Sequence, residues 1–296
     1  MSAPRQQPLA QGPQMSDPLA IVCGGGSLPF AVADAAIARG RRAVLYPLQG
    51  LVDPARLAAY RHHWIRLGQF GRFRRLLAEE DCRDVVFIGS LVRPGWRDMR
   101  FDLGMVAMLP TIVRAFRGGD DKLLTAMGRV MEEAGLRPLG AHEVAPEILV
   151  PQGVLGGVAP RESDRADIAT ALDFLAVTGR FDMGQAVVVA DQQVLGVEAA
   201  EGTDALLARI AQLRANRRIR LPHGTGVLVK APKPQQDRRF DLPSIGPRTI
   251  EGVAQAGLAG LAVVAGETVV ADPDDVVTAA DKHGVFAIGV PAGSIP

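Results

Sequence analysis

The stretch of this chain best suited to chemistry spans residues 229–249 and reads VKAPKPQQDRRFDLPSIGPRT. Its cations include Lys230, Lys233 and Arg239, and Asp241 supplies a carboxylate between two apolar neighbours. Such cations can bind the anionic oxygens of a phosphate ester, while a carboxylate can bind a metal or orient water. We therefore expect a functional loop for phosphate ester chemistry. The alternative is a surface loop whose charges compensate each other.

A second candidate site is the run GGGSLP, which begins at residue 24 between an expected strand and an expected helix. Backbone N–H groups and a helix N-terminus there can bind a phosphate, with Gly25, Gly26 and Ser27 as contacts. A tight turn without a ligand is the alternative. An NAD site is disfavoured, because Pro29 replaces the last glycine of G-x-G-x-x-G and the second strand ends near Gln49 and not near an acid.

Acidic residues gather at two further points. Asp120 and Asp121 open an expected helix, where they either cap it or hold a divalent cation that bridges phosphates. Glu198, Thr203 and Asp204 lie where a strand ends and a helix begins. Capping by Thr203 or Asp204 explains part of this second group, but not why so many acids lie at one strand end. We therefore expect Asp204 to help hold a metal and Thr203 to contact substrate.

The positions of the histidines and the missing motifs disfavour a hydrolase of the zinc or serine type. His62 and His63 are adjacent, so a strand would direct them to opposite faces, and we treat both as structural. His142 precedes a glutamate, a pair more typical of a structural hydrogen bond than of a metal site. Neither HExxH nor GxSxG occurs. The arginines of residues 72–75 lie on an amphipathic helix that is either a solvated face or a contact for anionic headgroups.

Length and composition indicate how these residues are positioned. A chain of 296 residues with 48% hydrophobic and 22% charged residues suits two soluble α/β domains. A formal net charge of +1 gives no electrostatic reason to expect a nucleic acid partner. We expect a disordered leader at 1–17, a Rossmann-like N-terminal domain with a parallel sheet at 18–147, and a C-terminal α/β domain with a mixed sheet at 148–296.

Hydrophobic periodicity and turn residues place the elements of each domain. In the first domain we expect strands at 19–23, 41–48, 63–67 and 84–89, and helices at 29–38, 71–80, 105–116 and 120–134. In the second we expect helices at 164–178, 203–213, 247–255 and 273–282, a hairpin at 186–190 and 194–199, and strands at 227–230, 261–265, 268–270 and 285–290.

Two cysteines, Cys23 and Cys82, lie far apart in apolar surroundings. We expect buried free thiols, which fit a reducing cytoplasm. No apolar run is long enough to span a bilayer.

Six motifs, taken in order, resemble one bacterial family: the UDP-2,3-diacylglucosamine pyrophosphatases of lipid A synthesis, of the type unrelated to the metallophosphoesterases. The resemblance covers about residues 19–292. Any single motif is weak, and the ordered set is more specific. They are GGGSLP at 24, GDD at 119–121, AHE at 141–143, DMGQ at 182–185, EGTD at 201–204 and KAPKPQQDRRFDLPSIGPRTI at 230–250.

The resemblance implies two α/β domains with the substrate between them. It implies a Mg²⁺-dependent hydrolase that converts UDP-2,3-diacylglucosamine to UMP and 2,3-diacylglucosamine 1-phosphate, with water attacking the phosphate nearer the sugar. The family's essential aspartate lies in R-x-D-L-P, which is Asp241 here, while Asp237 has a less certain match. The remaining metal ligands would come from Asp120, Asp121, Glu198 and Asp204.

The same resemblance predicts the partners and the location. The partner would be a UDP-diacylglucosamine glycolipid, met in transient contact with the inner membrane of a Gram-negative bacterium by an otherwise cytoplasmic protein. The protein is compatible with a homodimer, which no motif decides. The alternatives are a nucleotide-sugar transferase, a nucleotide-sugar or lipid-binding protein without hydrolase activity, and an NAD-dependent reductase. Acyl-chain length and metal identity are not encoded in any motif that we recognise.

Overall fold

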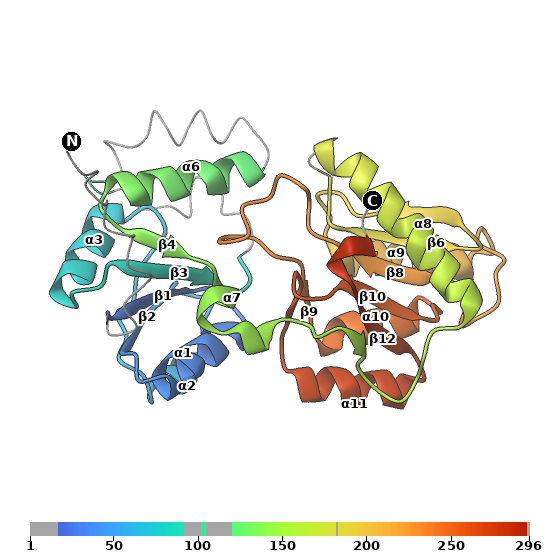
Figure 1. Cartoon of the computed structure of the whole chain (residues 1–296), viewed down its shortest axis with the longest axis horizontal. Coiled ribbons are helices and arrows are strands. Elements are labelled where there is room, and N and C mark those ends of the chain that lie inside the picture. Colours follow the sequence, from blue (N-terminus) through green and yellow to red (C-terminus); the bar gives the residue numbers. More distant parts are fainter. Residues whose placement is uncertain (1–16, 92–101, 103, 105–119, 182, 295–296) are drawn as a thin grey trace, which may run out of the picture.

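The computed structural model describes residues 17–91, 102, 104, 120–181 and 183–294. The expected leader, apart from Asp17, and the expected helix at 105–116 lie outside the described residues. Figure 1 shows two sheets side by side, each with helices packed on it. Among the described helices, none is both long and apolar enough to cross a membrane.

The N-terminal sheet is wholly parallel and has the order β2-β1-β3-β4. The parallel sheet is confirmed, and its order is the flavodoxin-like one, so the more specific Rossmann-like expectation is not confirmed. The order changes direction between β1 and β3, where ligands of open α/β sheets bind. The strands are β1 (Leu19–Cys23), β2 (Ala43–Pro47), β3 (Asp84–Ile88) and β4 (Arg137–Leu139).

Helices cover both faces of this sheet because its strands are apolar on both sides. Leu19 and Ile21 of β1 face the cluster under α1, whereas Ala20 and Val22 face the cluster under α3. Cys23 and Cys82 are buried free thiols, as expected. The described helices are α1 (Leu28–Ala38), α2 (Pro54–Leu57), α3 (Phe70–Glu79), α6 (Asp120–Glu133), α7 (Ala141–Val144) and the short η2 (Pro146–Ile148).

The C-terminal sheet is mixed, as expected, with the order β5-β12-β10-β8-β6-β7. β8, β10 and β12 are parallel, and β5, β6 and β7 pair antiparallel to their neighbours. Asp191 and Gln192, with φ of 48° and 59°, form the tight turn of the expected hairpin. The strands are β5 (Gly153–Val154), β6 (Ala186–Ala190), β7 (Gln193–Val197), β8 (Val227–Lys230), β10 (Gly260–Val264) and β12 (Phe286–Val290).

One helix packs on one face of this sheet and three on the other. α8 covers a face formed by residues such as Val187 and Val229, while α9, α10 and α11 bury the opposite face around Leu228 and Leu261. These helices are α8 (Glu162–Thr178), α9 (Thr203–Ala215), α10 (Pro247–Gln255) and α11 (Pro273–His283), with short η3 (Gly179–Phe181) and η4 (Ala292–Ser294).

Several elements differ from the expected ones: the short α2, α7 and β5 were not expected, and two further differences concern strands. The strand expected at 63–67 is not formed. This stretch runs beside β2 but pairs with the chain there only through isolated backbone bridges, including Leu48 to Ile65, and not through a continuous ladder. A two-stranded sheet of β9 (Ser244–Ile245) and β11 (Val269–Val270) was not expected. The strand expected at 268–270 is thus shorter, and its partner lies inside the functional segment of residues 229–249.

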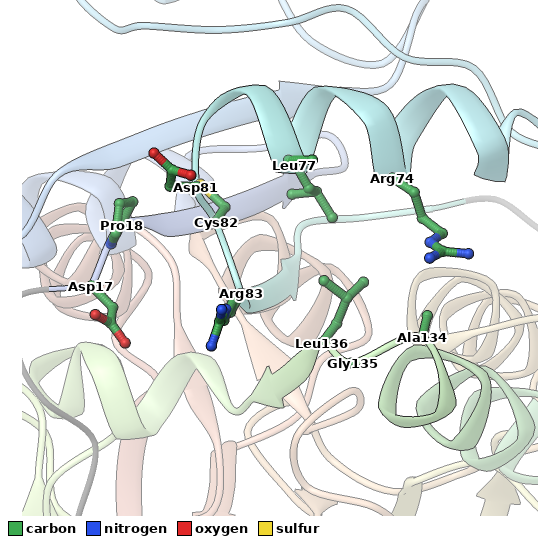
Figure 2. A pocket seen from close by; sticks show the side chains of 11 residues that line it. Asp17, Pro18, Arg74, Leu77, Asp81, Cys82, Arg83, Ala134, Gly135 and Leu136 are labelled. Atoms are coloured by element: carbon green, nitrogen blue, oxygen red, sulfur yellow. The ribbon is translucent and has the colours of Figure 1, made fainter.

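A cavity of about 530 Å³ lies at the amino edge of the N-terminal sheet (Figure 2). Residues that precede β1, β3 and β4 line it, among them Asp17, Arg83 and Leu136, with Arg74 of α3 beside them. The glycine run follows β1, so it lies at the carboxyl edge. The cavity is therefore on the wrong side of the sheet for the expected phosphate site.

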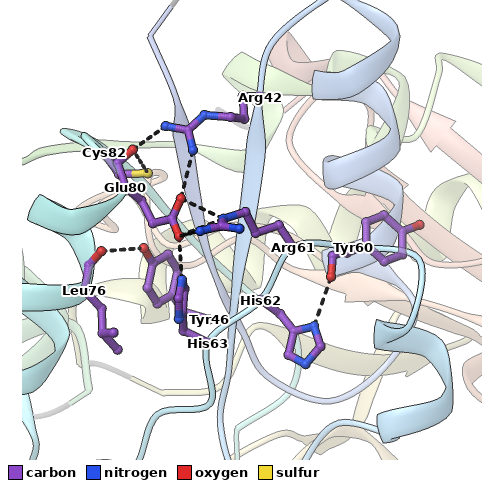
Figure 3. Close-up of polar contacts among 9 residues, drawn as sticks. All are labelled: Arg42, Tyr46, Tyr60, Arg61, His62, His63, Leu76, Glu80 and Cys82. Atoms are coloured by element: carbon purple, nitrogen blue, oxygen red, sulfur yellow. Dashed lines mark hydrogen bonds and ion pairs between the residues drawn. The ribbon is translucent and has the colours of Figure 1, made fainter.

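A buried carboxylate connects several side chains near the amino edge of the N-terminal sheet (Figure 3). Glu80, only 3% exposed, accepts hydrogen bonds from Arg61, Arg42 and His63. The bond from Arg61 is the largest cause that lowers the pKa of Glu80, to about 2, and those from His63 and Arg42 act in the same direction against the effect of burial. His63 thus has a structural role, and its ring stacks on the buried Tyr46.

We expect Glu80→Gln to destabilise the protein at neutral pH and to flatten its acid denaturation. The pKa of Glu80 is depressed from 4.5 to about 2, so its contribution is complete above about pH 4.5 and is lost as the pH falls towards 2. A shift of this size corresponds to about 3 kcal/mol. Urea unfolding between pH 7 and pH 2 measures it, with the exposed neighbour Glu79→Gln as control. Equal pH slopes for both variants would contradict the assignment.

Candidate active site

The segment of residues 229–249 runs from the C-terminal sheet to the two-stranded sheet of β9 and β11. It leaves the C-terminal sheet at the carboxyl end of β8 and returns through β9. Between these points it contacts the N-terminal domain: Arg239 Nη1 lies 2.8 Å from Glu132 Oε1 of α6, and the Phe240 ring centroid lies 5.7 Å from that of Phe87 in β3. Figure 1 shows this segment in orange between the two domains. The segment therefore contacts both domains, and the expected binding of substrate between them stays a prediction.

Asp241 is held within this segment by two amides. Gln185 Nε2 donates to Asp241 Oδ2 at 2.8 Å, and Gln236 Nε2 donates to the same oxygen. Gln185 precedes β6, which runs antiparallel to β8, so both strands bring residues to the same edge of the sheet. The carboxylate expected to be catalytic thus has a fixed direction at the carboxyl edge of β8.

Lys230 lies at the end of β8 and is buried, with 7% exposure. Its Nζ donates to the carbonyl of Ser244 at 2.8 Å. Burial lowers the pKa of Lys230, and the negative charges of Glu198, Asp204 and Asp241 oppose that shift. Three acids expected near the site thus act electrostatically on one ammonium group. That ammonium donates to protein here, and its expected role as a phosphate contact stays a prediction.

Glu198 is buried beside these groups and holds two donors. Thr203 Oγ1 donates to Glu198 Oε1 at 2.8 Å, and the backbone N–H of Gln185 donates to Oε2 at 2.8 Å. A Cβ at position 184 would lie 2.5 Å from Glu198 Cγ, so only glycine allows this approach. Thr203 therefore supports an acid in this structure, and its expected contact with substrate stays a prediction.

Arg239, Asp237 and Arg248 of the segment are also held in ion pairs. Arg239 Nη2 lies 2.8 Å from Asp237 Oδ2, in addition to its contact with Glu132, and these carboxylates raise the pKa of Arg239. Lys233 donates its backbone N–H to Gln236 Oε1 at 2.9 Å. Asp204 pairs with Arg248 at 2.8 Å. Substrate contacts from Arg239 and Lys233 stay predictions.

The glycine run forms a compact turn after β1. Gly25 exchanges backbone hydrogen bonds with Ser90, and a Cβ at position 24 would lie 2.6 Å from the Ser90 carbonyl oxygen. Close packing thus accounts for Gly24. Gly26, with φ of 96°, has open space around it, and Ser27 Oγ donates to Asp272 Oδ2 at 2.9 Å. The turn reaches the C-terminal domain, and its binding of phosphate stays a prediction.

The expected metal ligands are only partly described. Asp120 and Asp121 open α6, and their side chains lie outside the described residues. Among the side chains that the structure describes, no group of three or more His, Cys, Asp or Glu could hold a metal by itself. Mg²⁺ commonly takes one or two carboxylates and completes its shell with water and substrate phosphate oxygens, and Asp241 and Asp204 have the oxygen ligands it prefers.

Two polar residues at the site were missed by the sequence interpretation. Gln185 ends the motif DMGQ, and Gln236 is the second residue after the last proline of KAPKP. Both stretches were recognised as motifs, but neither glutamine received a role. An amide side chain carries no charge, so only its proximity to Asp241 in three dimensions shows what it does.

Comparisons with known proteins agree with the motif order. The model of the LpxI N-terminal domain matches residues 18–148, and that of the LpxI C-terminal domain matches residues 151–288. A UDP-2,3-diacylglucosamine pyrophosphatase LpxI from Caulobacter vibrioides is 42% identical over 272 residues, or 92% of this chain and 97% of that protein. A solved UDP-glucose-4-epimerase from Stenotrophomonas maltophila covers 95% of this chain and 96% of its own, at 12% identity and a TM-score of 0.27, and a likeness this low carries no argument.

Proposed function

This chain belongs to the LpxI family, and we infer that it hydrolyses the pyrophosphate bond of UDP-2,3-diacylglucosamine in lipid A biosynthesis. The products are UMP and 2,3-diacylglucosamine 1-phosphate. The 42% identity with the Caulobacter vibrioides pyrophosphatase, over 92% of this chain, carries the inference. The position of Asp241, held by amides between two domains, supports it.

We propose that Asp241 is the catalytic carboxylate. Hydrolysis joins the oxygen of water to phosphorus and breaks the bond to the bridging oxygen, which leaves with the second phosphate. A carboxylate assists by holding a metal or by orienting the water. Lys230, Lys233, Arg239, Thr203 and the glycine run are the proposed substrate contacts.

Asp241→Asn should lower the rate of UMP release by at least about 100-fold, because the carboxylate acts in the transition state and an amide of the same shape cannot replace its charge. Binding of UDP-2,3-diacylglucosamine should stay within a few-fold of the wild-type value. Release of UMP, followed by chromatography, measures turnover. Asp173→Asn, at an exposed position of α8, is the matched control. Near-normal turnover in Asp241→Asn would show that the assignment is wrong.

We propose Mg²⁺ as the cofactor, with Asp241, Asp204, Asp120 and Asp121 as candidate ligands. When bound, Mg²⁺ would neutralise negative charge on the phosphate oxygens. The negative charges of Asp241 and Asp204 both oppose the lowering of the pKa of the buried Lys230, so the two carboxylates share one electrostatic environment. Substrate phosphates would then complete the metal's ligand shell.

Removal of divalent cations with EDTA should abolish UMP release, and added Mg²⁺ should restore it. In Asp204→Asn the Mg²⁺ concentration for half-maximal rate should rise about tenfold, a change typical of a disturbed metal site. Asp274→Asn, on the exposed first turn of α11, should titrate like the wild type. Full activity in EDTA would exclude the metal, and an unchanged titration in Asp204→Asn would remove that ligand.

We propose that the protein works in the cytoplasm and touches the inner membrane through the end of α8. The tip formed by the end of α8 and the following η3 carries Val177 and Phe181, which are 64% and 63% exposed. The Arg180 guanidinium lies 4.8 Å from the centre of the Phe181 ring. Apolar side chains beside a cation suit an anionic lipid surface. Gly179 packs against Pro234, where a Cβ would lie 2.7 Å from Pro234 Cδ, so this tip adjoins the segment that carries Asp241.

The double variant Val177→Ser with Phe181→Ser should bind phosphatidylglycerol vesicles about tenfold more weakly. The variant lacks the two apolar side chains whose transfer from water into the membrane favours binding. Its hydrolysis of detergent-dispersed substrate should stay close to normal. Sedimentation with vesicles measures the binding, and Ile37→Ser, at a position 50% exposed on α1, is the control. Equal sedimentation of both variants would place the membrane contact elsewhere.

A further inference from the structure

The carboxylate of Asp241 is gripped on one oxygen from two sides. Gln185 reaches it from the chain just before β6, and Gln236 reaches it from the turn that follows Lys233. A carboxylate can exchange its two oxygens by turning about its last side-chain bond. Two donors on Oδ2 oppose this rotation and fix the plane of the group.

The side-chain amide of Gln236 and the main chain of Gln185 are each held by further hydrogen bonds. Gln236 is 8% exposed, and its Oε1 accepts the N–H of Lys233 at 2.9 Å. Its Nε2 must therefore be the group that faces Asp241. Gln185 donates its backbone N–H to Glu198 Oε2 at 2.8 Å and accepts the N–H of Ala231 at 3.0 Å. The two donors thus belong to one network that joins β6, β7 and the end of β8.

We propose that Gln185 and Gln236 are positioning residues that aim Asp241 for the hydrolytic step. Both amides supply hydrogen bonds without adding a positive charge of their own. Glu198 and its donor Thr203 act one step further out by holding Gln185. This inference rests on the proposed function, because it gives a catalytic meaning to the orientation of Asp241.

The sharpest test is Gln236→Leu, which keeps the approximate volume of a buried side chain and removes its polar atoms. The turnover number should fall about 10- to 100-fold, the size expected when a catalytic group is misaligned. The two amides of Gln185 and Gln236 form a clamp on the Asp241 carboxylate. The KM for UDP-2,3-diacylglucosamine should change less than about threefold, because this clamp acts on Asp241 and not on substrate. Gln235→Leu, at the exposed neighbouring position, should match the wild type.

Three further measurements separate positioning from general damage. Gln185→Leu, at a half-buried position, should give the same pattern even if Gln236→Leu does not fold. Adding Gln236→Leu to Asp241→Asn should cause no further loss of turnover, because the clamp acts only through that carboxylate. Crystal structures should show the Asp241 side chain turned in Gln236→Leu and unchanged in Gln235→Leu.

The outcomes are distinct. A wild-type protein that releases no UMP would contradict the proposed function, and the orientation of Asp241 in the crystal structures would still decide whether the clamp exists. An active wild type with normal turnover in both leucine variants would overturn the positioning role. A further loss in the Asp241→Asn background of the same size as in the wild type would overturn it as well.

Discussion

The buried side chain of Lys230 is the constraint on which the C-terminal part of the site depends. Removing a charge from water is costly unless other groups compensate it. Here the compensation comes from the Ser244 carbonyl and from the charges of Glu198, Asp204 and Asp241. The bond to Ser244 ties the end of β8 to the start of β9, so the residues between them must form a loop over the carboxyl edge of the sheet.

This loop also depends on the N-terminal domain. Phe240 packs beside Phe87 at the end of β3, and a Cβ at position 128 of α6 would lie 2.8 Å from the Phe240 ring. Glycine at 128 therefore makes room for the ring. Arg239 adds an ion pair to Glu132 of the same helix. Since Asp241 follows these contacts directly, the packing between domains helps to decide where its carboxylate lies.

The sequence allowed most helices and strands and the mixed second sheet to be predicted, because apolar periodicity is a local signal. The catalytic role of Asp241 came from the family resemblance and stays a prediction. The sequence could not give the strand order of the first sheet, which depends on long-range pairing. The charges of Arg239 suggested a phosphate contact, whereas in the structure they meet Asp237 and Glu132. Gln185 and Gln236 lie 51 positions apart, so no local pattern could reveal that they share one oxygen.

Two carboxylates in this protein show how their donors separate structural from chemical roles. Glu80 receives guanidinium and imidazole groups, and the hydrogen bond from Arg61 above all lowers its pKa to about 2. A carboxylate so matched by cations has little left to offer a ligand. Asp241 instead receives amides from Gln185 and Gln236, which direct an oxygen without cancelling its charge. Uncharged donors fix the direction of a carboxylate oxygen without contributing a positive charge of their own, and this is the arrangement proposed to aim Asp241.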